Sequence, residues 1–121
     1  MAHQESDKFE QIRRARKIGH KYFMDRSAVY RKFAELEEVT FKDGALTTRE
    51  KELIAVGISI VNSCEPCLEW HVRQALTAGA SEDQVVEAIG VAMEMGIGPT
   101  TVTARFAVEV LDQALRPEPE A

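Results

Sequence analysis

The sequence has few signals for β-strands and only two cysteines in its 121 residues. No segment alternates apolar and polar residues over a sustained length, which argues against an all-β fold and against a mixed fold built on a sheet. Two cysteines are too few for the disulfide framework that holds many small secreted domains together. A close cysteine pair in a chain of this type is more often catalytic or metal-binding than structural.

Long apolar runs are also missing. The longest, Leu53 to Val61, is interrupted by Gly57 and Ser59, and it is far shorter than the ~18 residues of a membrane-spanning helix. The N-terminal segment "MAHQESDKFEQ" lacks the apolar stretch of a secretion signal. We therefore expect a cytoplasmic protein that does not enter a membrane.

An excess of acidic residues argues against nucleic acid as a partner. The chain has 20 acidic and 15 basic side chains, for a formal net charge of -5, whereas nucleic-acid binding needs a concentrated basic surface. The one basic cluster comprises Arg13, Arg14, Arg16 and Lys17. It is interpreted as the solvated face of a helix.

Helix signals fill the rest of the chain, and they predict one all-α domain over residues 1–116. Apolar residues at helical spacing over 6–38 indicate one or two amphipathic helices with a break near Gly19. The Pro- and Glu-rich residues 117–121 are expected to be a disordered tail. Four further helices are predicted: from Thr47 to about Asn62, from Ser63 to a left-handed cap at Gly79, from a Ser81–Gln84 capping box to Gly96, and from Pro99 onward.

Two of these helices are apolar on more than one side. In "LIAVGISIV" and "AIGVAMEMGIG" few side chains suit contact with water. This pattern fits subunit association, and it equally fits one helix lying at the centre of a bundle.

The stretch "VNSCEPCLEWH" holds Cys64, Cys67 and His71. With Ser63 as the helix cap, Cys64 and Cys67 would be the first and fourth helical residues, with their Cβ atoms about 5 to 6 Å apart and within reach of a disulfide. Cys64 would lie at the positive end of the helix dipole, which favours its thiolate. Cys67 would share a face with His71, a candidate base. The two arguments leave open which cysteine attacks first, and the proton relay favours Cys67.

A carboxylate could orient the histidine. If the chain reverses at Asn62-Ser63, Glu52 lies about 16 Å back along one helix and His71 about 12 Å forward along the next. The two would then reach similar heights and form a Glu52–His71–Cys67 relay. The competitors for the carboxylate role are Glu50, assigned to a capping box with Thr47, and Glu65 and Glu69, expected to face solvent.

Two other interpretations of the cysteines are open. They could be small packing residues placed together by chance. They could also be half of a zinc site, which usually needs four ligands. In that case His71 would be near, and His3 or His20 would have to reach over from the N-terminal helix.

The spacing E-x11-C-x2-C-x3-H, formed by Glu52, Cys64, Cys67 and His71, resembles the core motif of alkylhydroperoxidase D (AhpD)-like proteins of the carboxymuconolactone decarboxylase superfamily. The similarity extends over residues 45–110. It implies an all-α, AhpD-like helical bundle with intertwined subunits, assembled as a trimer or hexamer.

The resemblance also implies a thiol–disulfide oxidoreductase that reduces a small hydroperoxide or disulfide. Cys64 and Cys67 would be the redox pair, His71 the base and Glu52 its partner, with no cofactor and no metal. A dithiol electron-donor protein would recharge the pair. One position departs from AhpD, which has a histidine immediately before the second cysteine where this chain has Pro66. That departure puts the peroxidase step in doubt.

Two alternatives to this function stay open. One is a decarboxylase-like enzyme without redox chemistry that kept the scaffold, although the decarboxylase branch does not use this cysteine pair. The other is a metal-binding or scaffold oligomer without turnover.

Overall fold

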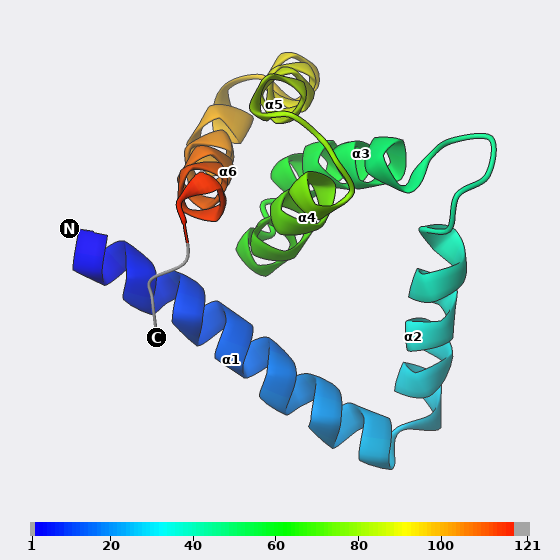
Figure 1. The fold of residues 1–121 in the computed structure, drawn as a ribbon. Coiled ribbons are helices and arrows are strands. Elements are labelled where there is room, and N and C mark those ends of the chain that lie inside the picture. The colour runs from blue at the N-terminus through cyan, green and yellow to red at the C-terminus, as the bar shows by residue number, and fades with distance from the viewer. Residues whose placement is uncertain (1, 118–121) are drawn as a thin grey trace. The chain divides into compact units, whose positions relative to one another are not determined.

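A computed structural model describes residues 2–117, with side chains from residue 7 onward. These residues form six helices, and no strand occurs among them, as predicted for an all-α protein (Figure 1). The chain divides into two compact units, one ending at Thr47 and the other beginning at Thr48. The single domain over residues 1–116 stays a prediction, and residues 118–121 of the predicted tail lie outside the described residues.

The first unit consists of α1 (Ala2–Arg26) and α2 (Ala28–Thr40). The predicted break near Gly19 is wrong, because α1 runs through Gly19 and the chain breaks at Ser27. Ser27 has extended backbone angles, and its hydroxyl accepts a hydrogen bond from the Tyr30 amide at 3.0 Å. A serine cap satisfies a backbone donor that would otherwise lack a partner, whereas a glycine inside a helix costs only about 1 kcal/mol.

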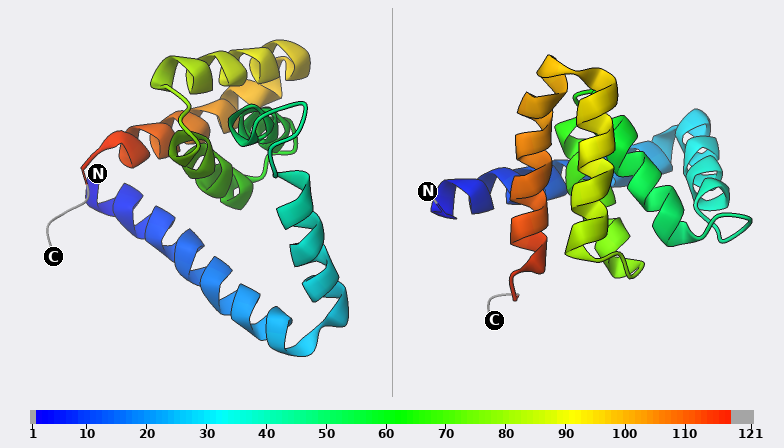
Figure 2. Two further views of the ribbon diagram at one scale, coloured as in Figure 1. Left: turned by 45° about the vertical axis from the view of Figure 1, so that its right-hand side comes forward. Right: turned by 90° about the horizontal axis from the view of Figure 1, so that it is seen from above.

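The second unit is a bundle of four helices. Its core contains apolar side chains from all four, among them Val56, Leu68, Val85 and Val110. Helices α5 and α6 lie side by side, and α3 packs against α4, α5 and α6 (Figure 2). The helices are α3 (Thr48–Val61), α4 (Glu65–Thr77), α5 (Glu82–Gly96) and α6 (Gly98–Leu115).

The ends of these helices follow their sequence signals closely. Ser81 and Gln84 form the predicted capping box at the start of α5. Gly79 follows α4 with a φ of +98°, the left-handed conformation that glycine adopts at little cost. Between α3 and α4 the chain reverses through Ser63, whose φ is +54°. This reversal sets α4 against α3, the geometry on which the predicted relay depends.

The turn between α5 and α6 holds a strained residue. Ile97 has φ +58° and ψ -146°, and its side chain is 76% exposed. A positive φ is unfavourable for a β-branched residue. The buried Thr100 hydroxyl donates to the Ile97 carbonyl oxygen at 2.5 Å and fixes this turn.

None of the helices described in residues 2–117 is long and apolar enough to cross a membrane.

We predict that Ile97→Gly raises the free energy of unfolding by about 1 kcal/mol, because relief of the strain exceeds the entropy that glycine adds to the unfolded chain. Denaturant unfolding measures this change. Ile97→Ala is the matched control, since alanine keeps the Cβ atom and should gain little. Equal effects of the two substitutions would refute strain as the cause.

Candidate active site

The two cysteines form a disulfide at the start of α4. The Cys64–Cys67 bond has an S–S length of 2.04 Å, and the two Cα atoms lie 5.3 Å apart. Both residues are partly accessible to solvent. The pair is therefore close enough to cycle between dithiol and disulfide, as the spacing predicted.

Cys64, rather than Ser63, caps helix α4. Its backbone is extended, and its sulfur accepts a hydrogen bond from the Cys67 amide at 3.3 Å. The expectation that Cys64 is the first helical residue is therefore wrong by one position. The reason is the positive φ of Ser63, which places Ser63 in the turn before the helix. The Cys64 sulfur thus occupies the site where a helix N-terminus best stabilises negative charge.

Glu52 and His71 meet across α3 and α4, as the predicted reversal of the chain requires. The Glu52 Oε2 atom lies 3.0 Å from the His71 Nδ1 atom. The side chain of Glu52 is 5% exposed and that of His71 is 17% exposed. A buried carboxylate needs such a partner, because burying an unpaired charge is costly.

This pairing assigns the two ring nitrogens. An ionised carboxylate can only accept, so Nδ1 of His71 carries the proton that is shared with Glu52. The other nitrogen, Nε2, is then the one that can take up or release a proton. His71 is four residues beyond Cys67 in α4, which places both on one face of the helix. The four residues of the motif are thus gathered around the first two turns of α4.

Glu65 and Glu69, which were considered as alternatives to Glu52 for orienting His71, differ in how deeply they are buried. Glu65, in the first turn of α4, is half-buried. Glu69 was expected to face solvent, and this is wrong, since its side chain is fully buried. It accepts a hydrogen bond at 2.6 Å from the Arg73 guanidinium, which also donates to the Gln113 side chain of α6 at 2.5 Å.

Sequence reasoning could have found this Glu69 cluster. Glu69 lies on the same helical stripe as the buried residues Leu68, Val72 and Ala75, and Arg73 follows it at the four-residue spacing of an intrahelical ion pair. The cluster joins α4 to α6 through Arg73. It therefore helps to hold the helix that carries the cysteines.

Ser63 makes a further contact beside the disulfide. The Thr103 hydroxyl of α6 donates to the Ser63 hydroxyl at 3.4 Å. The turn that precedes Cys64 is thus connected to a second helix, a contact for which the sequence carried no signal.

The described cysteine and histidine side chains that were considered as zinc ligands do not form a metal site. No group of three or more histidine, cysteine, aspartate or glutamate residues there could hold a metal ion. His20 instead lies 2.9 Å from the Tyr30 hydroxyl within the first unit. The side chain of His3 lies outside the described residues.

The family of the chain follows from its similarity to known proteins. Residues 27–110 match the model of the carboxymuconolactone decarboxylase family. The chain belongs to this family. Its AhpD-like resemblance is thereby confirmed at the level of family and fold.

Two relatives match about two thirds of the chain. The uncharacterized protein 4 in the cox locus of Paracoccus denitrificans is 46% identical over 81 residues, 67% of this chain and 73% of the relative. An uncharacterized protein of Cupriavidus necator is 34% identical over 80 residues, 66% of this chain and 71% of the relative. Alkyl hydroperoxide reductase AhpD of Anaeromyxobacter sp. is 46% identical over only 41 residues, 34% of this chain and 22% of that protein.

Solved structures share the fold over most of the chain. A carboxymuconolactone decarboxylase family protein from Legionella pneumophila has a TM-score of 0.84 and 28% identity, covering 91% of this chain and 99% of its own. A family member from Thermotoga maritima, described as possibly involved in antioxidative response, has a TM-score of 0.79 and 24% identity, covering 85% and 88%. At 24% identity, the similarity to the Thermotoga maritima protein supports a shared fold and nothing further.

We predict that Glu52→Gln shifts the pH at which the reactive thiol is half-ionised to a higher value. Without the carboxylate, an imidazolium at His71 is less stable and so is the thiolate paired with it. The pH dependence of alkylation of the reduced protein by iodoacetamide measures this shift. Glu109→Gln, at an exposed position of α6, is the control. A profile for Glu52→Gln that overlays the wild type would remove Glu52 from the relay.

Proposed function

We propose that the protein is a thiol–disulfide oxidoreductase that reduces a small hydroperoxide or disulfide through Cys64 and Cys67. The observation that carries this proposal is a disulfide at the N-terminus of α4, with His71 four residues beyond Cys67 in the same helix and 3.0 Å from Glu52 of α3. Its support from relatives is the short match to AhpD. The proposed site of action is the cytoplasm.

In the oxidative half of the cycle, the Cys67 thiolate attacks one oxygen of the hydroperoxide. The O–O bond breaks, Cys67 becomes a sulfenic acid, and the departing alkoxide takes a proton from His71 to leave as an alcohol. The Cys64 thiolate then attacks the sulfenic sulfur. The S–S bond forms, and the oxygen leaves as water after taking up a proton.

In the reductive half, an external dithiol resets the pair. One donor thiolate attacks the Cys67 sulfur and displaces the Cys64 thiolate, and the second donor thiol then releases Cys67 as the donor becomes a disulfide. The position of Cys64 at the helix cap favours it as the leaving thiolate, since a stabilised thiolate departs faster. This division of labour gives each cysteine one role, with Cys67 attacking and Cys64 resolving.

We further propose that the protein acts as a homo-oligomer, a trimer or hexamer. Exposed apolar side chains on both units support this, among them Val29 at 82% and Val91 at 65% exposed. Large exposed apolar patches are uncommon on monomeric proteins and often mark interaction sites. The other partners proposed are the small oxidant and a dithiol donor protein.

We predict that Cys67→Ser abolishes the hydroperoxide-dependent consumption of dithiothreitol, because it lacks the attacking thiol. Cys64→Ser should be slowed, because dithiothreitol must then reduce the Cys67 sulfenic acid without the resolving cysteine. The loss of dithiol is followed with tert-butyl hydroperoxide as oxidant. Wild-type rates in both variants would refute the redox proposal. Turnover of carboxymuconolactone by protein with both cysteines alkylated would support the decarboxylase alternative instead.

A single-turnover experiment separates the two cysteine roles. Reduced Cys64→Ser should consume about one equivalent of peroxide and form a sulfenic acid at Cys67, which a dimedone adduct detects by mass. Reduced Cys67→Ser should not react at that rate. The reverse pattern would assign the attack to Cys64.

A further inference from the structure

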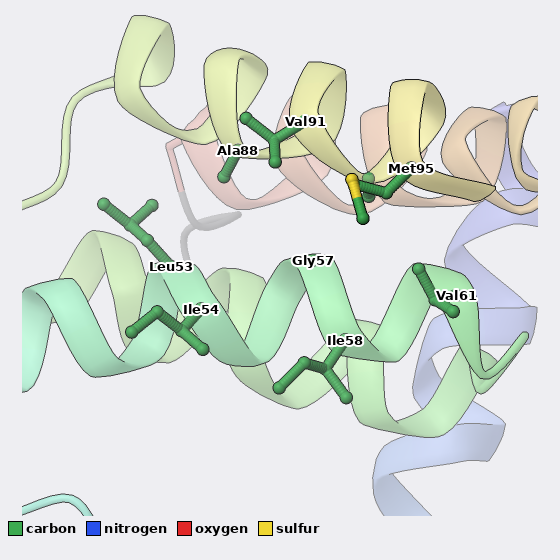
Figure 3. Close-up of a pocket in the computed structure, with 9 residues that line it drawn as sticks. Leu53, Ile54, Gly57, Ile58, Val61, Ala88, Val91 and Met95 are labelled. Atoms are coloured by element: carbon green, nitrogen blue, oxygen red, sulfur yellow. The ribbon is translucent and has the colours of Figure 1, made fainter. Parts of the chain in front are cut away.

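An apolar groove runs between α3 and α5, on the side of α3 away from Glu52. It has a volume of about 450 Å³, and only apolar residues line it (Figure 3). Ile58 and Val61 of α3 and Val91 and Met95 of α5 border it, and each is at least half exposed. A groove of this kind fits the apolar side of a helix.

The α5 border of the groove is acidic. Asp83, Glu87 and Glu94 are exposed, and α5 contains no basic residue. They are separated by four and seven residues, so they follow one edge of the helix, beside Val91. Any helix that enters the groove therefore meets a line of negative charge next to the apolar surface.

One face of α1 has the complementary pattern. Ile18 and Tyr22, four residues apart, are 61% and 53% exposed. Arg14, Lys17 and Lys21 are exposed along one edge of this apolar pair. Arg14 and Lys21 are seven residues apart, as are Glu87 and Glu94, so both charged pairs span about 10.5 Å along their helices.

We propose that the groove between α3 and α5 binds the Arg14–Tyr22 face of α1 from a second copy of the chain. Ile18 and Tyr22 enter the groove, while Arg14 and Lys21 pair with the Glu87 and Glu94 edge. This inference rests on the proposed self-association and specifies which surfaces make it.

The other apolar surfaces of the chain fit the groove less well by charge. If the grooves of two copies faced each other, the acidic α5 edges of both copies would lie close together. Helix α2 exposes Val29, Phe33 and Leu36, but its three glutamates outnumber its two basic residues. Both basic residues also have partners within the first unit: Lys32 pairs with Glu35 at 3.3 Å, and Arg31 donates to the Met24 carbonyl oxygen at 2.7 Å. Like charges placed opposite one another oppose association, so the basic face of α1 is the occupant that the charges favour.

A charge-swap experiment tests the inference. One full-length variant carries Glu87→Lys and Glu94→Lys, and the other carries Arg14→Glu and Lys21→Glu. Each alone should weaken self-association about 100-fold or more, because like charges then face each other. A variant that carries all four substitutions in one chain should associate again, since every groove then meets an α1 of opposite charge. Light scattering after size-exclusion chromatography measures the masses, with the disulfide kept oxidised.

Two controls make the result specific. A variant with Glu38→Lys and Glu109→Lys reverses two exposed acidic charges elsewhere and should associate like the wild type. Circular dichroism should show that all variants keep wild-type helix content. A wild-type protein that is monomeric would refute both self-association and this inference. A wild-type oligomer whose swap variants keep its mass, or whose four-substitution variant stays dissociated, would refute this inference alone.

Discussion

The hydrogen bond between Glu52 and His71 is the constraint on which the site depends. Glu52 lies on the buried stripe of α3 with Val56, Ser59 and Ile60, where an unpaired carboxylate would be costly. Its partner is supplied by the next helix, and only a close reversal of the chain brings that helix alongside. The turn through Ser63 therefore does two things at once: it satisfies the buried carboxylate, and it sets the N-terminus of α4, with Cys64 at its cap, beside the same pair.

Much of this arrangement was predictable because the signals are local. Capping residues, a glycine with positive φ and the E-x11-C-x2-C-x3-H spacing each act within a few turns of helix, so Ser81, Gly79 and the Glu52–His71 pair lie where expected. The failures have a different origin. The position of Ser27 as a cap and the left-handed Ser63 depend on which of several polar residues adopts the turn conformation. Contacts between helices decide such questions, and a single sequence does not show them.

The family of the chain does not by itself decide its chemistry. A fold can host unrelated reactions, so the activity must be argued from the site. The family is named for a decarboxylase, whereas this chain joins two cysteines beside a carboxylate–histidine pair, a set that suits electron transfer between sulfur atoms. Pro66, which stands where AhpD has a histidine, affects the peroxidase step more than the formation of the disulfide. It occupies the first turn of α4 without disturbing the Cys64 cap. A site of this kind can exchange disulfides even where its peroxidase step is slow.

Helix α3 connects the site to the proposed interface, because its two faces have different partners. One face places Glu52 against α4, and the other borders the groove with Leu53, Ile54 and Ile58. A helix held on both sides loses more of its freedom than one held on a single side, and precise positioning of catalytic groups depends on such support. Occupation of the groove by a second copy would therefore hold Glu52 more firmly against His71. Under the proposed self-association, the exposed apolar surface and the buried carboxylate would act together, because the second copy would help to hold the Glu52–His71 pair in place.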